Sequence, residues 1–156
     1  MEGPPGATGP KGEQGDLGPA PVVRRRSSAF TVVRSSTQTG SPGDVLHFPT
    51  AKFNIGNDFD VSTGIFTCKV AGIYSFQFHI SFDHNSETVI QLIKDGGQIV
   101  SIYRDREAGL DIASNGATLP LSQGDQVWLR FANNRGTVFS NDWEYTSFSG
   151  VLVQEM

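Results

Sequence analysis

The stretch that decides the fold is Gly72-Ile73-Tyr74-Ser75-Phe76-Gln77-Phe78-His79-Ile80-Ser81-Phe82. Large apolar residues stand at every second position from Tyr74 to Phe82, and polar residues stand between them. Successive side chains of a strand point to opposite faces of its sheet, so five large apolar groups share one face. The pattern therefore predicts a strand of a sheet that packs one face against a core.

Shorter runs on both sides of this stretch extend the β pattern. The clearest signal is Asp95-Gly96-Gly97, which predicts a hairpin between 89–94 and 98–103, because glycine accepts positive φ at no steric cost. Ser122-Gln123-Gly124-Asp125 predicts a second turn, and Ser41-Pro42-Gly43-Asp44 ends a polar loop. Many short strands without a helical period indicate an all-β sandwich or jelly roll. Further strands are expected at residues 30–34, 126–131 and 147–153.

The start of the chain follows a different rule. The chain has 156 residues and 18 glycines, and six glycines fall in the first 18 positions at a strict period of three, with prolines between them. This is the composition of collagen, in which three strands leave room at their common axis only for glycine. A flexible linker is the alternative, but it would not keep this phase. The expected axial residues are Gly3, Gly6, Gly9, Gly12, Gly15 and Gly18.

A basic neck separates the two patterns and divides the chain into residues 1–20, 21–28 and 29–156. It contains Arg24-Arg25-Arg26, and a trimer would bring nine arginines together. Such a cluster could attract anionic polymers or lipid heads. The alternative is a solvated neck that discourages aggregation. A basic-pair processing site lacks its usual upstream arginine, because Val22 and Val23 stand there.

Composition excludes several classes. The net charge is −4 with acids and bases interspersed, which argues against nucleic-acid binding. No apolar run approaches the roughly 18 residues that a membrane-spanning helix needs. Any secretory signal has been removed or lay upstream of Met1-Glu2-Gly3. The single cysteine, Cys68, cannot form an intrachain disulfide and is expected to be a small buried residue.

Catalytic motifs are missing from the sequence. There is no Gly-x-Ser-x-Gly elbow, His-Glu-x-x-His pair, phosphate loop or Cys-x-x-Cys pair. The three histidines, His47, His79 and His84, do not have the spacing of metal ligands on one element. We therefore expect a protein that is not an enzyme.

A more specific resemblance rests on aromatic and glycine spacing across residues 29–156. The pattern is similar to the signature of the C1q globular domain at every position, and residues 147–153 resemble the closing strand of that family. The resemblance implies a ten-stranded jelly roll, related to tumour necrosis factor folds, that assembles as a compact trimer behind a collagen stalk. The residues that carry it are Phe48, Asn54, Phe59, Phe66, Gly72, Tyr74, Phe76, Phe148 and Gly150.

The resemblance also suggests a calcium site. Residues 103–114 are similar to a segment that carries calcium-binding carboxylates near the trimer axis in short network collagens. Asp111 matches the family position and Asp105 is a second candidate, although the stretch before Asp111 is one residue shorter. Calcium would relieve repulsion between converging carboxylates. The alternative is a solvated ionic loop in which Arg104 and Arg106 neutralise the acids.

The expected function is that of a secreted, extracellular recognition module. Trimeric heads, from identical or homologous chains, would bind microbial, immune-complex or cell-surface ligands, and the collagen stalk would bundle them so that weak contacts add through avidity, as in innate immunity and complement-like pattern recognition. Two alternatives are an adiponectin-like or synaptic-organiser-like signalling ligand and a structural network collagen, against which the short repeat argues. Candidate contacts for anionic ligands are Arg104, Arg106, Arg130 and Arg135, with ordinary solubilising charge as the alternative.

Overall fold

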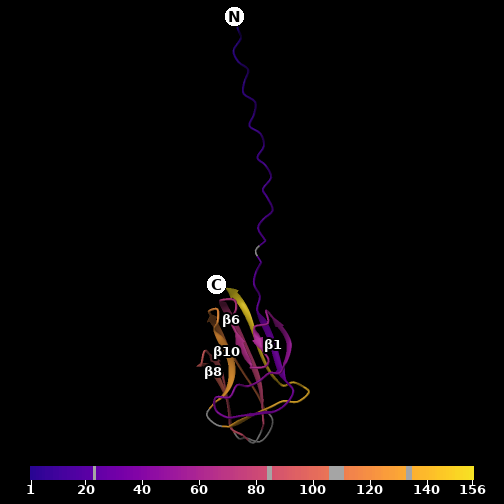
Figure 1. The fold of residues 1–156 in the computed structure, drawn as a ribbon, viewed down its shortest axis with the longest axis vertical. Coiled ribbons are helices and arrows are strands. Elements are labelled where there is room, and N and C mark those ends of the chain that lie inside the picture. Colours follow the sequence, from indigo (N-terminus) through magenta and orange to yellow (C-terminus); the bar gives the residue numbers. More distant parts are fainter. Residues whose placement is uncertain (23, 84–85, 106–110, 133–134) are drawn as a thin grey trace.

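The computed structural model describes residues 1–22, 24–83, 86–105, 111–132 and 135–156. A β-rich head carries an extended N-terminal segment that projects away from it (Figure 1). The described residues up to Ser27 are all exposed and form no strand or helix. The glycine repeat of residues 1–20, called the repeat segment below, therefore contributes nothing to the core of a single chain.

The head is built from two antiparallel sheets, as the sequence predicts. The seven-stranded sheet has the order β2-β11-β6-β12-β1-β3, with β9 paired to β6, and the five-stranded sheet has the order β4-β5-β10-β7-β8. The described residues contain no helix. The strands are β1 Ala29–Arg34, β2 Gln38–Gly40, β3 Thr50–Ile55, β4 Phe59–Asp60, β5 Ile65–Thr67, β6 Gly72–Phe82, β7 Thr88–Lys94, β8 Gly97–Arg104, β9 Asp111–Leu121, β10 Gln126–Ala132, β11 Gly136–Phe139 and β12 Thr146–Glu155.

Three of the strands, β2, β4 and β5, have only two or three residues, and such short pairings account for the difference from the ten strands that the resemblance implied. β2 has three residues and pairs at the sheet edge with β11, while β4 has two residues and pairs with β5. β2 lies in the segment that the sequence predicted to be a polar loop. A pairing this short leaves no alternation that a sequence pattern could reveal.

The core confirms the prediction for β6. All five alternate residues from Tyr74 to Phe82 have no exposed surface. The ring of Phe76 lies between neighbours from β1, β5 and β12, with centroid distances of 6.4 Å to Phe30, 5.6 Å to Phe66 and 6.1 Å to Phe148. Aromatic rings at such separations pack favourably in offset and edge-to-face arrangements. Strands that are distant in the sequence are thus held together by one aromatic cluster.

Two residues with the family spacing shape this cluster without adding bulk to it. A Cβ at Gly150 would stand 2.6 Å from the ring of Phe30 and 2.8 Å from that of Phe76, so only glycine fits there. The Asn54 side chain donates to the Phe59 carbonyl at 2.7 Å and accepts from the Phe59 amide at 3.2 Å. It therefore closes the turn between β3 and β4. Phe48, Phe59, Phe66 and Phe148 are buried.

The hairpin between β7 and β8 is confirmed as well. Lys94 pairs with Gly97, which leaves Asp95 and Gly96 as a two-residue turn with φ of 49° and 89°. Positive φ at both central residues is the geometry that matches the twist of two antiparallel strands. The predicted strands 89–94 and 98–103 each gain a residue or two at their ends.

The acidic segment at 103–114 is different from the expected loop. β9 begins at Asp111 and pairs with β6 along the whole length of that strand, from Asp111 opposite Phe82 to Leu121 opposite Gly72. Residues 106–110 lie outside the described part of the chain. The strand escaped prediction because its first inward positions hold Asp111, Ala113, Asn115 and Ala117, so large apolar residues appear in period only at its end, at Leu119 and Leu121.

The two ends of the head differ in what they connect. Ser28, where the neck joins β1, lies beside the last strand of the chain, β12: the Leu152 amide donates to the Ser28 carbonyl at 2.8 Å. The Ser28 hydroxyl donates to buried Asp58 at 2.5 Å, and Lys69 Nζ lies 3.1 Å from the other oxygen of that carboxylate. We call this the stalk end. The opposite end, where β6, β8 and β10 end and β7, β9 and β11 begin, is called the distal end (Figure 1).

Candidate binding surfaces

The outward side of the seven-stranded sheet forms the broadest candidate surface. Strand register places small and polar residues over the aromatic core: the outward residues Ser75, Gln77 and His79 of β6 each have an outward neighbour on β9 and on β12. We call this surface the open face, and it consists of Ala29, Thr31, Ser75, Gln77, His79, Ser114, Gly116, Thr118, Ser147, Ser149 and Val151. None of these residues is Asp, Glu, Lys or Arg.

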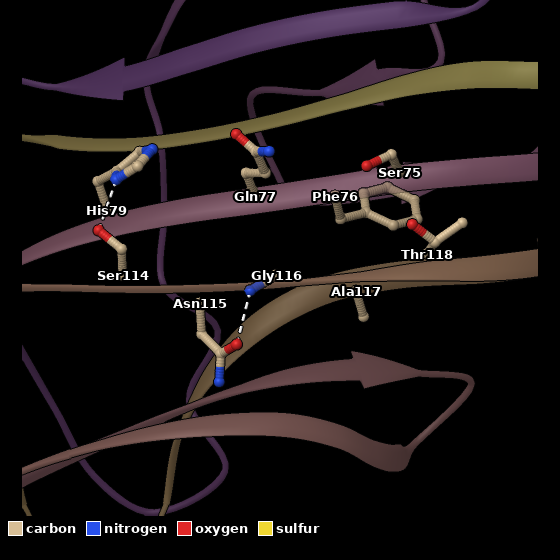
Figure 2. Close-up of a pocket in the computed structure, with 9 residues that line it drawn as sticks. All are labelled: Ser75, Phe76, Gln77, His79, Ser114, Asn115, Gly116, Ala117 and Thr118. Atoms are coloured by element: carbon tan, nitrogen blue, oxygen red, sulfur yellow. Dashed lines mark hydrogen bonds between the residues drawn. The ribbon is translucent and has the colours of Figure 1, made fainter.

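A shallow hollow of about 560 Å³ lies over β6 and β9 on the open face (Figure 2). His79 Nδ1 and the Ser114 hydroxyl are 2.6 Å apart, which ties the two strands together above the sheet. Gly116 lets β9 lie close to β6 at the floor of the hollow, because a Cβ at this position would collide with the Phe76 carbonyl oxygen. Asn115 points the other way and donates to the Ser101 carbonyl of β8 at 3.0 Å. The sequence placed His79 on the polar face but gave no sign of Ser114.

The hydrogen bond between His79 and Ser114 does not have the geometry of a catalytic pair. A nucleophilic serine requires a base that is itself oriented by a third group. Within the described residues, no hydrogen bond to His79 other than that of Ser114 is found. Both side chains are exposed on a nearly flat sheet. The pair therefore shapes a binding surface and lacks the surroundings that would activate the hydroxyl.

Apolar residues border the open face at both ends. Phe53, Ile55 and Val151 lie toward the stalk end, and their side chains are 45–51% exposed. A smaller hollow of about 250 Å³ runs from Phe53 across Thr31 and Ser149 to Gln77. At the distal end, a hollow of about 450 Å³ is lined by Ser81, Asp111, Ile112 and Tyr145. Exposed apolar groups around a polar, charge-free centre are typical of surfaces that contact another protein.

The distal end also presents Trp143, which the sequence analysis missed. Its indole is 79% exposed at the tip of the turn 141–144. Its backbone is fixed, since the Trp143 amide donates to the Asn141 side chain at 2.9 Å and the Glu144 amide donates to the Asn141 carbonyl at 2.8 Å. Lys52 pairs with Glu144 at 2.6 Å. The signal in the sequence was a tryptophan inside a polar turn, Asn141-Asp142-Trp143-Glu144.

The candidate arginines lie on separate elements. Arg104 ends β8, where its Nη1 lies 3.1 Å from a carboxylate oxygen of Asp111. Arg130 lies within β10, and its Nε donates to the Gln91 side chain at 3.0 Å. Arg135 is exposed just before β11. Arg106 lies outside the described residues. The structure thus brings one arginine to an acid and shows no single patch formed by the described three.

The fit for calcium within one chain is poor. The described residues contain no group of three His, Cys, Asp or Glu side chains that could hold a metal ion. Asp111 faces Arg104, and Asp105 follows β8 as an exposed residue. Calcium takes six to eight oxygen ligands, so carboxylates from several copies of the chain would have to converge. A calcium site stays a prediction that depends on assembly.

Cys68 is buried, as expected. Its thiol donates to the Val70 carbonyl at 3.2 Å, and the Tyr74 hydroxyl donates to the same oxygen at 2.6 Å. Burial raises the pKa of the Cys68 thiol and, as its largest cause, the pKa of the Tyr74 phenol. Both groups are therefore held in their neutral, unreactive forms.

Two antiparallel sheets with this strand order around an aromatic core define a jelly roll of the C1q and tumour necrosis factor type. The C1q domain model matches residues 29–153, and the chain belongs to the C1q-domain family. The globular domain of zebrafish complement 1qA superposes with a TM-score of 0.69 at 26% identity, covering 83% of this chain and 99% of that one. Eiger, a tumour necrosis factor from S. frugiperda, shares the fold with a TM-score of 0.67 at 12% identity, covering 84% and 94%.

Two curated relatives share the head sequence. Caprin-2 of Danio rerio is 36% identical over 130 residues, and the collagen alpha-1(X) chain of Mus musculus is 35% identical over 131 residues. The matches cover 81% and 83% of this chain but only 14% and 19% of those proteins. Family membership therefore concerns the head. The described residues contain no helix that could span a membrane.

Proposed function

We propose that this protein is a secreted trimeric recognition module, in which three heads associate through their open faces and bind a ligand at the distal end. The observation that carries the proposal is the charge-free open face. The head has eight basic and thirteen acidic side chains, yet none of them belongs to this surface. Surfaces that remain in water are usually rich in charge, whereas the centres of interfaces are depleted of it.

The repeat segment supports the same stoichiometry. A Cβ added at any of its six glycines would meet nothing within 4 Å in a single chain. The requirement for glycine at every third position thus has no cause inside one chain, and the close approach of two further chains supplies one. Trimeric heads would align the three repeat segments, because a triple helix of six triplets is marginal by itself.

The distal end is the surface to which we assign the recognised ligand. The stalk end is occupied by the neck, and the open faces by neighbouring heads. Trp143 offers an exposed indole on a fixed turn, and tryptophan is prominent among residues that dominate binding energy. Arg104 and Arg135 lie at the same end and would favour anionic groups. Several heads presented together would add weak contacts through avidity.

A structural role in an extracellular network is the second candidate. It is supported by the 35% identity of the head with the collagen alpha-1(X) chain of mouse. Such a role would use the same trimeric head to start assembly of the repeat segments, but it would not require a ligand at the distal end.

The assembly is tested by the mass of the purified chain in light scattering. We expect a particle of three chains, about 51 kDa from a chain of 16.9 kDa. A single-chain mass over a wide range of protein concentrations would overturn the trimer and, with it, the assignment of the open face.

The recognition role is tested by an array that carries lipopolysaccharide, peptidoglycan, immunoglobulin and cells with intact surface receptors. We expect saturable binding to at least one of the first three, reduced in Trp143→Ala and retained in Gln98→Ala, a control on an exposed residue of β8. Binding only to receptor-bearing cells would favour a signalling ligand. No binding by a well-folded trimer would favour the structural role.

A further inference from the structure

We propose that Arg24, Arg25 and Arg26 form a binding site for sulfated polysaccharide at the stalk end, here called the arginine collar. This site is separate from ligand recognition at the distal end. Its full affinity rests on the proposed trimer, which brings the arginines of three chains together. The neck thus has a ligand of its own, a linear polyanion of the extracellular matrix type.

Charge is sharply segregated around the collar. The repeat segment carries Lys11 against three acidic residues, and the head carries eight basic against thirteen acidic side chains. Three consecutive arginines therefore stand between two acidic regions. A positive cluster in this setting is a local feature that the net charge of −4 conceals.

The guanidinium groups are available to a ligand. Arg24, Arg25 and Arg26 are exposed, and among the described residues no hydrogen bond or ion pair to them is found. Arg25, Arg26 and Ser27 line a hollow of about 520 Å³ together with the end of β12, residues 152–155. A rigid planar fork of N–H donors suits oxyanions, which it can bind through two parallel hydrogen bonds.

The hollow contains one group that opposes an anion. Glu155 belongs to its lining and carries a negative charge at neutral pH. A polyanion on the collar must therefore lie toward the arginines and away from the end of β12. This predicts that removing the Glu155 charge strengthens binding, an effect that a collar without a ligand on this side would not show.

Shape favours a polymer chain over a membrane. The collar lies at the junction between the projecting repeat segment and the wider head (Figure 1). A flexible polysaccharide can wrap this junction, whereas a flat bilayer would meet the head or the repeat segment first. In the trimer, nine guanidinium groups would surround the junction, and repeated sulfates along one polymer could contact several of them.

The experiment uses the full chain and measures binding to immobilised heparin fragments at several salt concentrations. We compare Arg25→Gln/Arg26→Gln with Lys11→Gln/Lys52→Gln, which removes the same number of charges from exposed positions elsewhere. We expect the collar variant to bind heparin at least about tenfold more weakly, because six arginine charges that would pair with sulfates are lost per trimer. The affinity of the control should stay within about twofold of the unchanged chain. Glu155→Gln should bind more tightly, and Arg24→Lys/Arg25→Lys/Arg26→Lys should keep part of the affinity.

Equal weakening of the two double variants would overturn the collar and indicate a response to net charge alone. Tighter binding to phosphatidylserine vesicles than to heparin would overturn the choice of a polysaccharide, and so would equal binding to unsulfated hyaluronan. Light scattering of the same samples separates the two proposals. A trimer that ignores heparin refutes the collar only, whereas a monomer that binds heparin through Arg25 and Arg26 refutes the trimer only.

Discussion

The two faces of β6 obey different constraints although they belong to one strand. On the inner face, Tyr74, Phe76 and Phe78 are fully buried, and the ring of Phe76 lies against rings from β1, β5 and β12. On the outer face, Ser75, Gln77 and His79 lie partly or fully in solvent on a surface without charge. The inner face holds one chain together. The outer face leaves the fold unaffected and is suited to contact other chains.

The largest expected effect comes from breaking the inner face. Phe76→Ala should lower the free energy of unfolding by about 3–5 kcal/mol, because it removes a ring from the centre of the aromatic cluster and leaves a cavity. Urea denaturation at fixed protein concentration measures it. The matched control is Gln77→Ala on the outer face, which should change the same quantity by about 0.5 kcal/mol or less. Equal costs at the two positions would contradict the division of labour between the faces.

The second effect comes from charging the outer face. Ser149→Arg on β12 should convert the trimer to single chains while the circular dichroism spectrum stays the same, because an unpaired charge buried in the contact costs about 3–5 kcal/mol. The dissociation constant should weaken by more than about a hundredfold in sedimentation or light scattering.

The control for Ser149→Arg places the same side chain on the other sheet. Gln98→Arg on β8 adds an equal charge to an exposed position of the five-stranded sheet. It should leave the mass of three chains intact. Dissociation by both variants would show that added charge, and not its position, disrupts assembly.

A smaller effect concerns buried groups beside the inner face. The folded pKa of Cys68 lies above its ordinary value of 9.0, so the unfolded chain loses this proton more readily than the folded one. The stability gained from the neutral thiol is therefore fully present below about pH 9 and declines as the pH rises above it. The melting temperature of the native chain should fall between about pH 8 and pH 10.5 more steeply than that of Cys68→Ala. Parallel curves for the two proteins would refute this contribution.

The smallest effect concerns the distal rim of the outer face. Arg104 neutralises Asp111 in part, and an ion pair whose carboxylate is exposed, as that of Asp111 is, contributes about 1 kcal/mol or less. We therefore expect the melting temperature of the trimer to be the same with and without a chelator. A clear fall on chelation, restored by added calcium and absent in Asp111→Asn, would instead establish the calcium site on Asp111 and its counterparts in other chains.

The same contrast explains which parts of the fold were predictable. β6 and the turn at Asp95-Gly96 carry local signals, namely large alternating side chains and residues suited to positive φ. β9 pairs with β6 over eleven residues, but its inward positions include Ala113 and Ala117 and its outward ones include Ser114 and Gly116. Its place in the sheet is set by the partner strand and not by its own sequence, and Asp111 was therefore assigned to a loop.

The candidate surfaces were less accessible to sequence reasoning than the fold. The contact of His79 with Ser114 joins residues 35 positions apart, and the charge-free open face appears only when four strands are placed side by side. The signal for Trp143 is local, since a tryptophan stands in an otherwise polar turn. The arginine neck was visible at once because its residues are consecutive.

The attachment of the neck at Ser28 also determines how the head would respond to mechanical load. β1 starts at the next residue and lies between β12 and β3, with hydrogen bonds to both. A pull along the N-terminal segment would act along the axis of this inner strand and load its bonds together, in shear, whereas an edge strand could be peeled away one bond at a time. A ligand held at the far end would place the tension in the same direction, so the head is connected in a way that suits it to bear force.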